Sequence, residues 1–144
     1  MTQDEKDLLL KDLCMRLPYG VIVEIISYGQ ENLKPWVGKL NCKDLDCLIH
    51  DVAYQSVKPY LRPIKSMTTE EFAQYSYMVE KDKTIFCSFG SPLTTDWLLS
   101  NHFDYRGLIE KGLAIEVTKE NNPYKNYIIC LKFILKEYVK NFFL

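Results

Sequence analysis

The segment Asn101–Gly112 gathers four side chains that could do chemistry. His102, Asp104, Tyr105 and Arg106 supply an imidazole, a carboxylate, a phenol and a guanidinium within five residues. A histidine that titrates near neutral pH can act as a general base, provided that a nucleophile or a metal lies beside it. These four residues are a possible functional cluster, and an enzyme with a site near His102 is one function to weigh.

The same segment also has the pattern of a short capped helix. Asp is a favoured N-cap and Gly is favoured just past a helix end, so Asp104 and Gly112 predict a two-turn helix between them. Arg106 then has a carboxylate partner such as Asp96 or Glu110. The chain has no G-x-S-x-G elbow, no H-E-x-x-H pair and no G-x-x-x-x-G-K-[ST] loop. We therefore assign no catalytic residue and favour a protein that is not an enzyme.

A second set of candidate residues is Cys42, Cys47 and His50, spaced as C-x4-C-x2-H. Zinc takes four thiolate or imidazole ligands in a tetrahedron, and Cys87 or His102 could provide the fourth. Structural zinc sites usually show two closely spaced ligand pairs, whereas this chain shows one. If the segment is a strand, Cys47 and His50 also point to opposite faces. We expect neither a metal site nor a cofactor.

The segment 32–65 is net positive and interleaves basic with aromatic side chains. Sheets that hold single-stranded nucleic acid combine exposed aromatic rings for stacking with lysines for phosphates. A nucleic-acid-binding protein using the segment 34–65 is therefore an alternative function. Three aspartates in the same segment favour a solvated sheet face instead. The possible nucleic-acid contacts are Lys34, Trp36, Lys39, Lys43, Lys58 and Arg62, and the aromatic residues Tyr54 and Tyr60 are interleaved with them.

The whole chain of 144 residues has a formal net charge of −1, which argues against a generally basic nucleic-acid binder. Its five cysteines are irregularly spaced, and the residues after Met1 lack the basic and apolar pattern of a secretion signal. We expect free thiols that serve as small apolar core residues, in a protein of the reducing cytoplasm.

Local signals mark three helix starts. Thr2 with Glu5, and Thr68 with Glu71, have the spacing of capping boxes, in which side chains and backbone amides bond reciprocally. Ser91, followed by proline, supplies an N-cap and a first-turn residue for a third helix. The predicted helices are Gln3–Arg16, about 69–80 and about 92–101.

The segment 20–64 is expected to form the sheet. Short β-branched or apolar runs separated by turn residues are typical of strands, and Lys43–Asp44 is the expected turn between two of them. The fourth run carries two prolines, which predicts an edge strand or an extended segment. The predicted strands are Val21–Ser27, 35–42, 46–54 and 57–64, with a further candidate at 84–89.

The tail 126–144 has the composition of an amphipathic helix. Lys132, Lys136 and Lys140 recur every four residues, opposite a continuous apolar arc of the helical wheel. Its lysines are too frequent for a membrane span, which needs about 20 mostly apolar residues. We expect a helical extension that docks on its own domain or mediates self-association.

Three stretches carry a resemblance: LPYG, YLRPIKSMTTEE and DWLLSNHFDYRGLIEKGLAIE. Together they resemble a group of short uncharacterised proteins of gut anaerobes that are often encoded in prophage-like or other mobile segments. The block from Phe103 to Ala114 is the most specific part. The group commonly has two histidines before the phenylalanine, where this chain has Asn101–His102, and the tail beyond Lys125 departs from the group's pattern. The resemblance implies a mobile-element protein, and because the group has no assigned activity it transfers no catalytic residue to this chain.

These patterns predict an α+β protein with an N-terminal helix, a small, mostly antiparallel sheet that could curl into a half-barrel, and then several short helices. Residues 1–125 are expected to form one domain and 126–144 an extension. The favoured function is that of a small cytosolic accessory protein that acts by protein–protein interaction without catalysis. Its partner would be an unknown protein or a second copy bound through the tail, with nucleic acid as a further possible partner and no membrane span.

Overall fold

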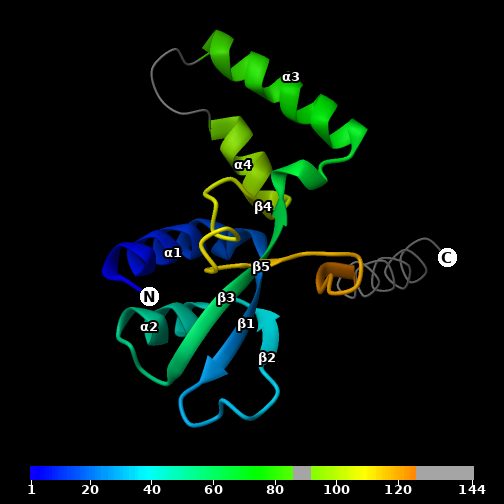
Figure 1. The fold of residues 1–144 in the computed structure, drawn as a ribbon. Coiled ribbons are helices and arrows are strands. Elements are labelled where there is room, and N and C mark those ends of the chain that lie inside the picture. The colour runs from blue at the N-terminus through cyan, green and yellow to red at the C-terminus, as the bar shows by residue number, and fades with distance from the viewer. Residues whose placement is uncertain (86–91, 126–144) are drawn as a thin grey trace, which may run out of the picture.

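The computed structural model describes residues 1–85 and 92–125. An N-terminal helix, a five-stranded sheet and further helices make up the fold, so the predicted α+β class is confirmed (Figure 1). The elements follow in the order α1 (Gln3–Arg16), a 3-10 turn (Leu17–Tyr19), β1 (Ile22–Ser27), β2 (Trp36–Lys39), α2 (Cys42–Ile49), β3 (Tyr54–Pro63), a second 3-10 turn (Ile64–Ser66), α3 (Thr69–Ile85), α4 (Pro92–Ser100), β4 (Phe103–Asp104) and β5 (Ile115–Glu116).

α1 has the bounds that its capping box predicts. The hydroxyl of Thr2 accepts a hydrogen bond from the amide of Glu5 at 3.2 Å, and the Glu5 carboxylate accepts one from the amide of Thr2 at 2.8 Å. This reciprocal pair satisfies amides that have no partner inside the helix. After the helix, Gly20 has a φ of 66°, a left-handed conformation that costs glycine little and that turns the chain into β1.

β1 lies between β2 and β3 and pairs antiparallel with both. Its register sets Ile25 opposite Trp36 on one side and Val57 on the other. β3 continues past β1, and its last residues pair in parallel with β5 and then β4. The sheet is therefore mixed, with the antiparallel pairing that we expected confined to β1, β2 and β3. Among the described strands it does not close.

β3 is a central strand, which corrects the expectation of an edge strand at 57–64. Pro59 forms the last pair of the ladder with β1, opposite Val23, and Pro63 forms the last pair of the ladder with β4. A proline has no N–H to donate to a ladder, so its position at the end of one limits the loss. The two prolines therefore mark ladder ends rather than a sheet edge.

α2 takes the place of the turn expected at Lys43–Asp44 and of the first part of the strand expected at 46–54. Asn41 accepts a hydrogen bond from the amide of Asp44 at 3.0 Å, and Asp44 accepts one from the amide of Asn41 at 3.1 Å. Leu45 and Leu48, three residues apart, both face the core. A third capping box and helical spacing of the leucines therefore outweigh the strand-like composition of the segment.

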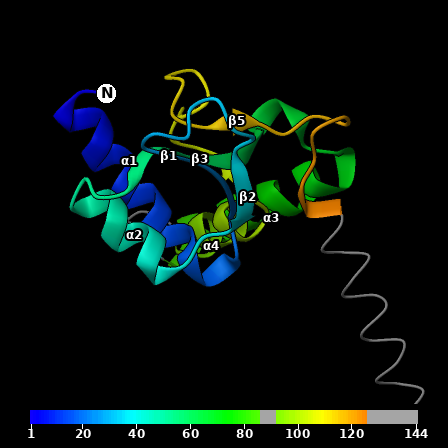
Figure 2. The same ribbon diagram turned by 90° about the horizontal axis from the view of Figure 1, so that it is seen from below.

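The core lies between the sheet and the neighbouring helices α1 and α2 (Figure 2). The chain between β4 and β5 supplies the remaining apolar side chains. The principal members of this core are Leu9, Leu13, Val23, Ile25, Leu45, Leu48, Val57, Leu61, Leu108 and Leu113.

α3 and α4 form a helical arm that projects away from the sheet (Figure 1). Thr68 and Glu71 exchange the hydrogen bonds of the second predicted capping box, at 3.2 and 2.9 Å. α3 is longer than predicted and includes Ile85, so the strand expected at 84–89 is wrong at its start. The rest of that run, Ser91 and the tail 126–144 lie outside the described residues.

A buried carboxylate joins the two helices of the arm. Asp82 on α3 accepts hydrogen bonds from both the amide and the hydroxyl of Thr94 on α4. Thr94 lies in the first turn of α4, where backbone amides lack partners within the helix. Asp82 of α3 thus caps the N-terminus of the neighbouring helix α4.

The two-turn helix expected between Asp104 and Gly112 does not form. Residues 105–114 instead make consecutive turns, in which the amide of Gly112 donates to the carbonyl of Ile109 at 3.0 Å. Gly107 and Gly112 have φ values of 71° and 70°. The left-handed Gly107 lies inside the expected span, so a right-handed helix cannot run without interruption from Asp104 to Gly112.

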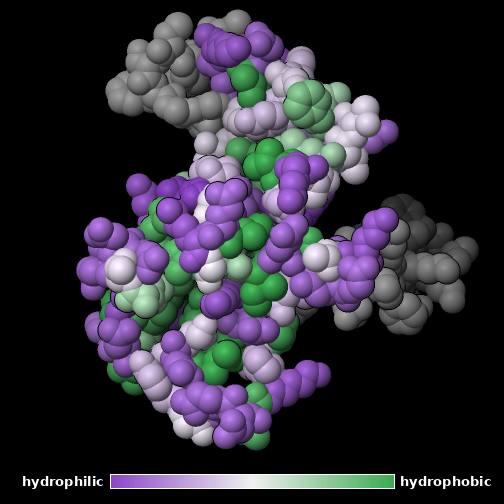
Figure 3. Space-filling view, viewed as in Figure 1, coloured by the Kyte–Doolittle hydropathy of each residue, from purple (hydrophilic) through white to green (hydrophobic). Residues whose placement is uncertain are grey.

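The molecular face shown in Figure 3 is mostly hydrophilic, with hydrophobic side chains in separate places. The large exposed hydrophobic residues belong to different elements, for example Leu33 between β1 and β2, Val52 before β3 and Phe72 on α3. None of the described helices combines the length and the apolar character needed to cross a bilayer.

Candidate functional site

The predicted cluster of four polar residues does not converge on one point. Asp104 turns toward the chain that follows it, and its carboxylate accepts hydrogen bonds from the amides of Leu108 at 2.9 Å and Ile109 at 2.8 Å. Asp104 therefore caps a turn, although not the helix that we predicted. A carboxylate bonded to two amides has a structural task that competes with a catalytic one.

Tyr105 and Arg106 face α1 instead. The guanidinium of Arg106 lies 3.3 Å from the carboxylate of Asp12 and also donates a hydrogen bond to the hydroxyl of Tyr105 at 3.1 Å. The partner of Arg106 is therefore Asp12, and not Asp96 or Glu110 as expected. Asp12 lies far from Arg106 along the chain, and a local sequence pattern cannot predict that the fold brings the two together.

Asp12 is held by a second arginine. Arg16 donates to its carboxylate at 2.6 Å and to the carbonyl of Phe103 at 2.7 Å, and the side chains of Asp12 and Arg16 are both fully buried. Burial raises the pKa of Asp12, against the effect of the two arginines. This ion pair fastens α1 to β4 and lies inside the protein, out of reach of a substrate.

His102 is separated from these residues by its backbone conformation. It follows α4, and its φ of 60° is left-handed, the conformation in which a helix end usually carries glycine. Its amide donates to the carbonyl of Leu99 at 3.1 Å, and its own carbonyl accepts from the amide of Arg62 at 2.8 Å. A residue with a side chain is less stable in this backbone conformation than glycine would be. The presence of an imidazole at this position therefore needs an explanation.

The imidazole of His102 stacks on the ring of Tyr124, with centroids 4.2 Å apart and planes 11° from parallel. Tyr124 is anchored in turn, because its hydroxyl donates to the carbonyl of Tyr60 at 2.8 Å and accepts from the amide of Ile22 at 3.2 Å. Burial raises the pKa of Tyr124, so the phenol stays protonated. The position of the imidazole is thus fixed by two strands.

Burial lowers the pKa of His102 to about 4, and the positive charges of Arg16 and Arg62 act in the same direction. The imidazole is therefore neutral at pH 7. Its Nδ1 atom is buried and has no hydrogen-bond partner among the described residues. Buried polar atoms are nearly always bonded, so an orphaned one marks a place that needs a functional explanation.

His102 lines a pocket of about 480 Å³ that opens to solvent between β2, β3 and the end of α4. This volume lies within the range of small-molecule sites. None of the described lining residues is a carboxylate. The polar side chains that line the pocket include Lys39, Arg62, Asn101, His102, Asn122 and Tyr124.

Arg62 is oriented by three contacts. Its guanidinium donates two hydrogen bonds to Glu71, at 2.8 and 2.7 Å, and lies over the ring of Phe103 at 4.3 Å from the centroid. The bonds from Arg62, with a backbone bond from Thr68, lower the pKa of Glu71. Glu71 therefore remains charged at neutral pH and holds the guanidinium at the pocket wall.

The residues predicted to contact nucleic acid are divided by the fold. Lys39 and Arg62 line the pocket, whereas Lys58 lines another cavity, and Lys43 lies on α2. Trp36 is 51% exposed on β2, while the hydroxyls of Tyr54 and Tyr60 bond to Asp44 and Glu24. The pocket around His102 thus takes in Lys39 and Arg62 of this segment and not Lys58.

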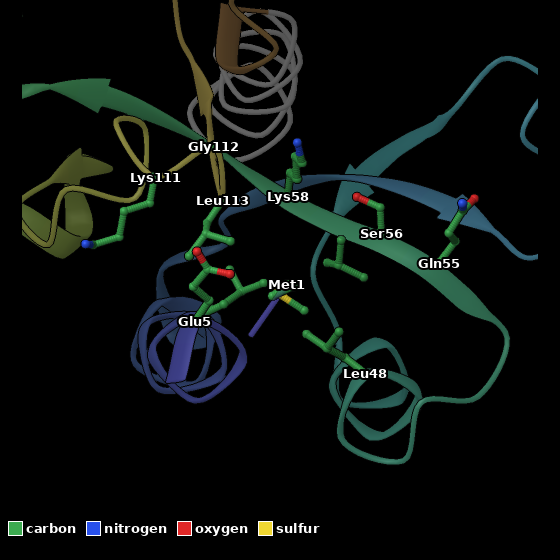
Figure 4. A pocket seen from close by; sticks show the side chains of 11 residues that line it. Met1, Glu5, Leu48, Gln55, Ser56, Lys58, Lys111, Gly112 and Leu113 are labelled. Carbon is green, nitrogen blue, oxygen red and sulfur yellow. The ribbon is translucent and has the colours of Figure 1, made fainter. Parts of the chain in front are cut away.

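The second cavity, of about 300 Å³, lies at the start of α1 (Figure 4). Met1, Glu5 and Leu113 lie close together in it, and Lys58 extends away from them. Glu5 already bonds to the amide of Thr2 in the capping box. The other polar side chains that line it are Gln55, Ser56, Lys58 and Lys111, and none of them has a buried polar atom without a partner.

The candidate metal ligands give no site in the described part of the chain. No group of three or more histidine, cysteine, aspartate or glutamate side chains is close enough there to hold a metal ion, and Cys87 lies outside it. Cys14, Cys42 and Cys47 are free thiols. The first two are exposed, so the expectation that the cysteines fill the core is wrong for them.

Asn122 and Tyr124 were missed by sequence reasoning. They lie about twenty residues after His102, in a polar segment without a motif, and only the path of the chain after β5 brings them to the pocket.

No family model, no curated protein and no solved structure matches this chain.

Proposed function

We propose that the protein is a non-catalytic cytosolic accessory protein that works by binding, and that the pocket around His102 is where it recognises its partner. The observation that carries this proposal is His102 itself. Its side chain is kept at a left-handed position at an energetic cost, is stacked on an anchored tyrosine and lines an open pocket.

Binding is favoured over catalysis because the acids and bases near His102 are already engaged. Asp104 bonds to two amides, and the hydroxyl of Ser100 donates to the carbonyl of Trp97 at 3.0 Å. A general base needs a nucleophile within hydrogen-bond reach, and among the described residues no hydroxyl or thiol is hydrogen-bonded to the imidazole of His102. The mobile-element setting of this function rests on the resemblance of the block Phe103–Ala114.

The nucleic-acid alternative gains less support. Of its six expected contacts, Lys39 and Arg62 line the pocket, and Arg62 is paired with Glu71. Single-stranded nucleic acid is held by a track of cations and stacking rings, whereas the hydroxyls of Tyr54 and Tyr60 are bonded to Asp44 and Glu24.

The test is affinity capture with matched baits from cells that make the protein. The baits are the native chain, Lys39→Gln and His102→Asn in the pocket, and Lys34→Gln as the control, because Lys34 belongs to the same basic segment but not to the pocket. Circular dichroism first shows that all four are folded.

The expected result is a stoichiometric partner that the native chain and Lys34→Gln retain and that both pocket variants lose. The purified partner should then bind the purified protein and be recovered chemically unchanged. A partner that all four baits retain equally, or a partner that is released in modified form, would contradict the proposal.

A further inference from the structure

The hairpin between β1 and β2 exposes four large hydrophobic side chains, at the end of the sheet opposite the helical arm (Figure 1). Tyr28 and Leu33 are 57% and 63% exposed on the connection, and Trp36 and Val37 are 51% and 44% exposed on β2. The amide of Tyr28 donates to the carbonyl of Ala53 at 2.9 Å, which fastens the hairpin to the turn before β3. Exposed aromatic and aliphatic side chains that gather on one element are typical of protein interfaces.

β2 is an edge strand with hydrogen-bonding groups that point away from the sheet. Among the described strands it pairs with β1 alone. The amide of Leu40 donates to the carbonyl of Val21 at 2.9 Å, which sets the phase of this ladder. Bonded pairs alternate along an antiparallel ladder, so Trp36 and Gly38 also bond to β1, and the N–H and C=O of Val37 point outward. No hydrogen bond to these two groups comes from the described residues.

An antiparallel edge strand is complementary to a second copy of itself. In a pair related by a two-fold axis at Val37, each Val37 donates its N–H to the C=O of the other, so both outward groups are satisfied. The same register sets Trp36 of each chain opposite Gly38 of the other. Gly38 has no side chain to compete with the indole of Trp36, which lies so close that a Cβ atom at position 38 would be 2.5 Å from it. The two indoles therefore have room to pack over the glycines.

Pro35 keeps such a ladder short. It would be the next residue to face outward, and a proline has no N–H to donate. The two copies must therefore be held mainly by side chains. The four exposed residues present about 400 Å² of side-chain surface per copy, since an aromatic side chain buries roughly 150–250 Å² when it is covered completely. Two copies together reach the lower end of specific interfaces, which predicts a dimer that dissociates at micromolar concentration.

We infer that the hairpin between β1 and β2 pairs with the same hairpin of a second copy of this chain, through antiparallel β2 strands centred on Val37. The two sheets then continue into one another across the two-fold axis. This inference goes beyond the proposed function, because none of the four exposed side chains lines the pocket around His102. The two proposals are therefore tested separately.

The experiment is sedimentation velocity of the full chain over a range of concentrations. Val37→Lys sets two like charges against each other at the axis, and Leu33→Gln removes apolar surface from the connection without changing the strand. Phe72→Gln is the matched control, because Phe72 is 60% exposed and lies on α3. Circular dichroism first shows that the variants are folded, and Leu33→Gln decides the test if Val37→Lys is not.

The native chain and Phe72→Gln are expected to form a dimer with the same dissociation constant. Val37→Lys and Leu33→Gln should each weaken the dimer about tenfold or more, because every substitution occurs twice in the pair. A native chain that stays monomeric at every concentration would overturn the inference. A dimer that the hairpin variants retain unchanged would overturn it as well, since the contact would then lie elsewhere.

Disulfide formation tests the position of the axis. A residue on a two-fold axis faces its own copy, with Cα atoms about 5.5 Å apart in a hydrogen-bonded pair, a separation that a disulfide spans. Val37→Cys should therefore give a disulfide-linked dimer under mild oxidation, whereas the native chain, in which Cys14 and Cys42 are exposed, should stay unlinked. Phe72→Cys is the control for random collision, and cross-linking of Phe72→Cys to the same extent as Val37→Cys would contradict the inferred register.

Discussion

His102 keeps a side chain at a backbone position where glycine is the favoured residue. The imidazole is stacked on Tyr124 and is neutral because burial and two arginines lower its pKa to about 4. In the unfolded chain the same group has a pKa near its ordinary value of about 6.5. As the pH falls from 6.5 toward 4, the unfolded state therefore takes up a proton that the folded state does not.

The expected consequence is a loss of stability toward acid that His102 causes. Urea denaturation between pH 7 and pH 4.5 should show the native chain losing up to about 3 kcal/mol more than His102→Asn over this interval. Asparagine tolerates the left-handed conformation and does not titrate, so both chains share every other acid effect. Parallel pH curves for the two chains would show that His102 is not the group responsible.

Gly38 allows Trp36 to fold back over its own strand. A Cβ atom at position 38 would lie 2.5 Å from two carbons of the Trp36 indole, so Gly38→Ala should displace the ring. We expect greater quenching of tryptophan fluorescence by acrylamide and a change in unfolding free energy of no more than about 1 kcal/mol. Gly29→Ala is the control: it has a φ of 75° and no atom within 4 Å of the added carbon. Quenching that rises equally in both variants would contradict this account.

The site could be predicted only in part at the residue scale. His102 and Arg62 stood out by type, and the structure places both in the pocket. Asn122 and Tyr124 could not be predicted, because they reach His102 through the fold and not through a spacing along the chain. The orphaned Nδ1 of His102 is likewise a property of packing alone.

At the scale of elements, prediction succeeded where side chains bond to backbone a few residues away. The boxes Thr2–Glu5 and Thr68–Glu71 gave the starts of α1 and α3 correctly. The box Asn41–Asp44 was equally visible, and α2 was missed because its apolar residues also suited a strand. The role of β3 could not be read locally, since its partners β4 and β5 lie more than forty residues further along.

The ion pair of Asp12 and Arg16 connects α1 with β4, and its burial decides its energetic weight. Asp12→Ala would leave Arg16 charged and fully buried, and we expect it to cost about 3–5 kcal/mol in the free energy of unfolding. Glu80→Ala breaks the exposed pair with Lys83 on α3 and should cost less than about 1 kcal/mol. Urea denaturation of both variants measures the difference. Similar losses in the two would show that burial does not strengthen the first pair.

At the scale of the whole molecule, the arm of α3 and α4 is the part with least support. Asp82 is the one buried residue among the described side chains of α3, and it bonds to Thr94. A helix depends on packing of one face for most of its stability, so α3 relies on this contact, on α4 and, in its first turn, on the ion pair between Glu71 and Arg62 of β3.

Asp82→Ala should therefore loosen the arm without unfolding the sheet. Hydrogen exchange followed by NMR is expected to speed up by about tenfold or more in α3, in line with the loss of a cap and of a buried bond. The amides of β1 and β3 should keep their protection. Glu70→Ala, an exposed change on the same helix, is the control. Uniformly faster exchange across arm and sheet would show that the two unfold together.

The bond between Arg16 and the carbonyl of Phe103 spans 87 residues. During synthesis, α1 leaves the ribosome long before Phe103 has been added to the chain. Until then the guanidinium of Arg16 cannot donate to the carbonyl of Phe103 and donates to water instead. The contacts that fix α1 in the finished protein are therefore completed only when residues 103–114 reach the core.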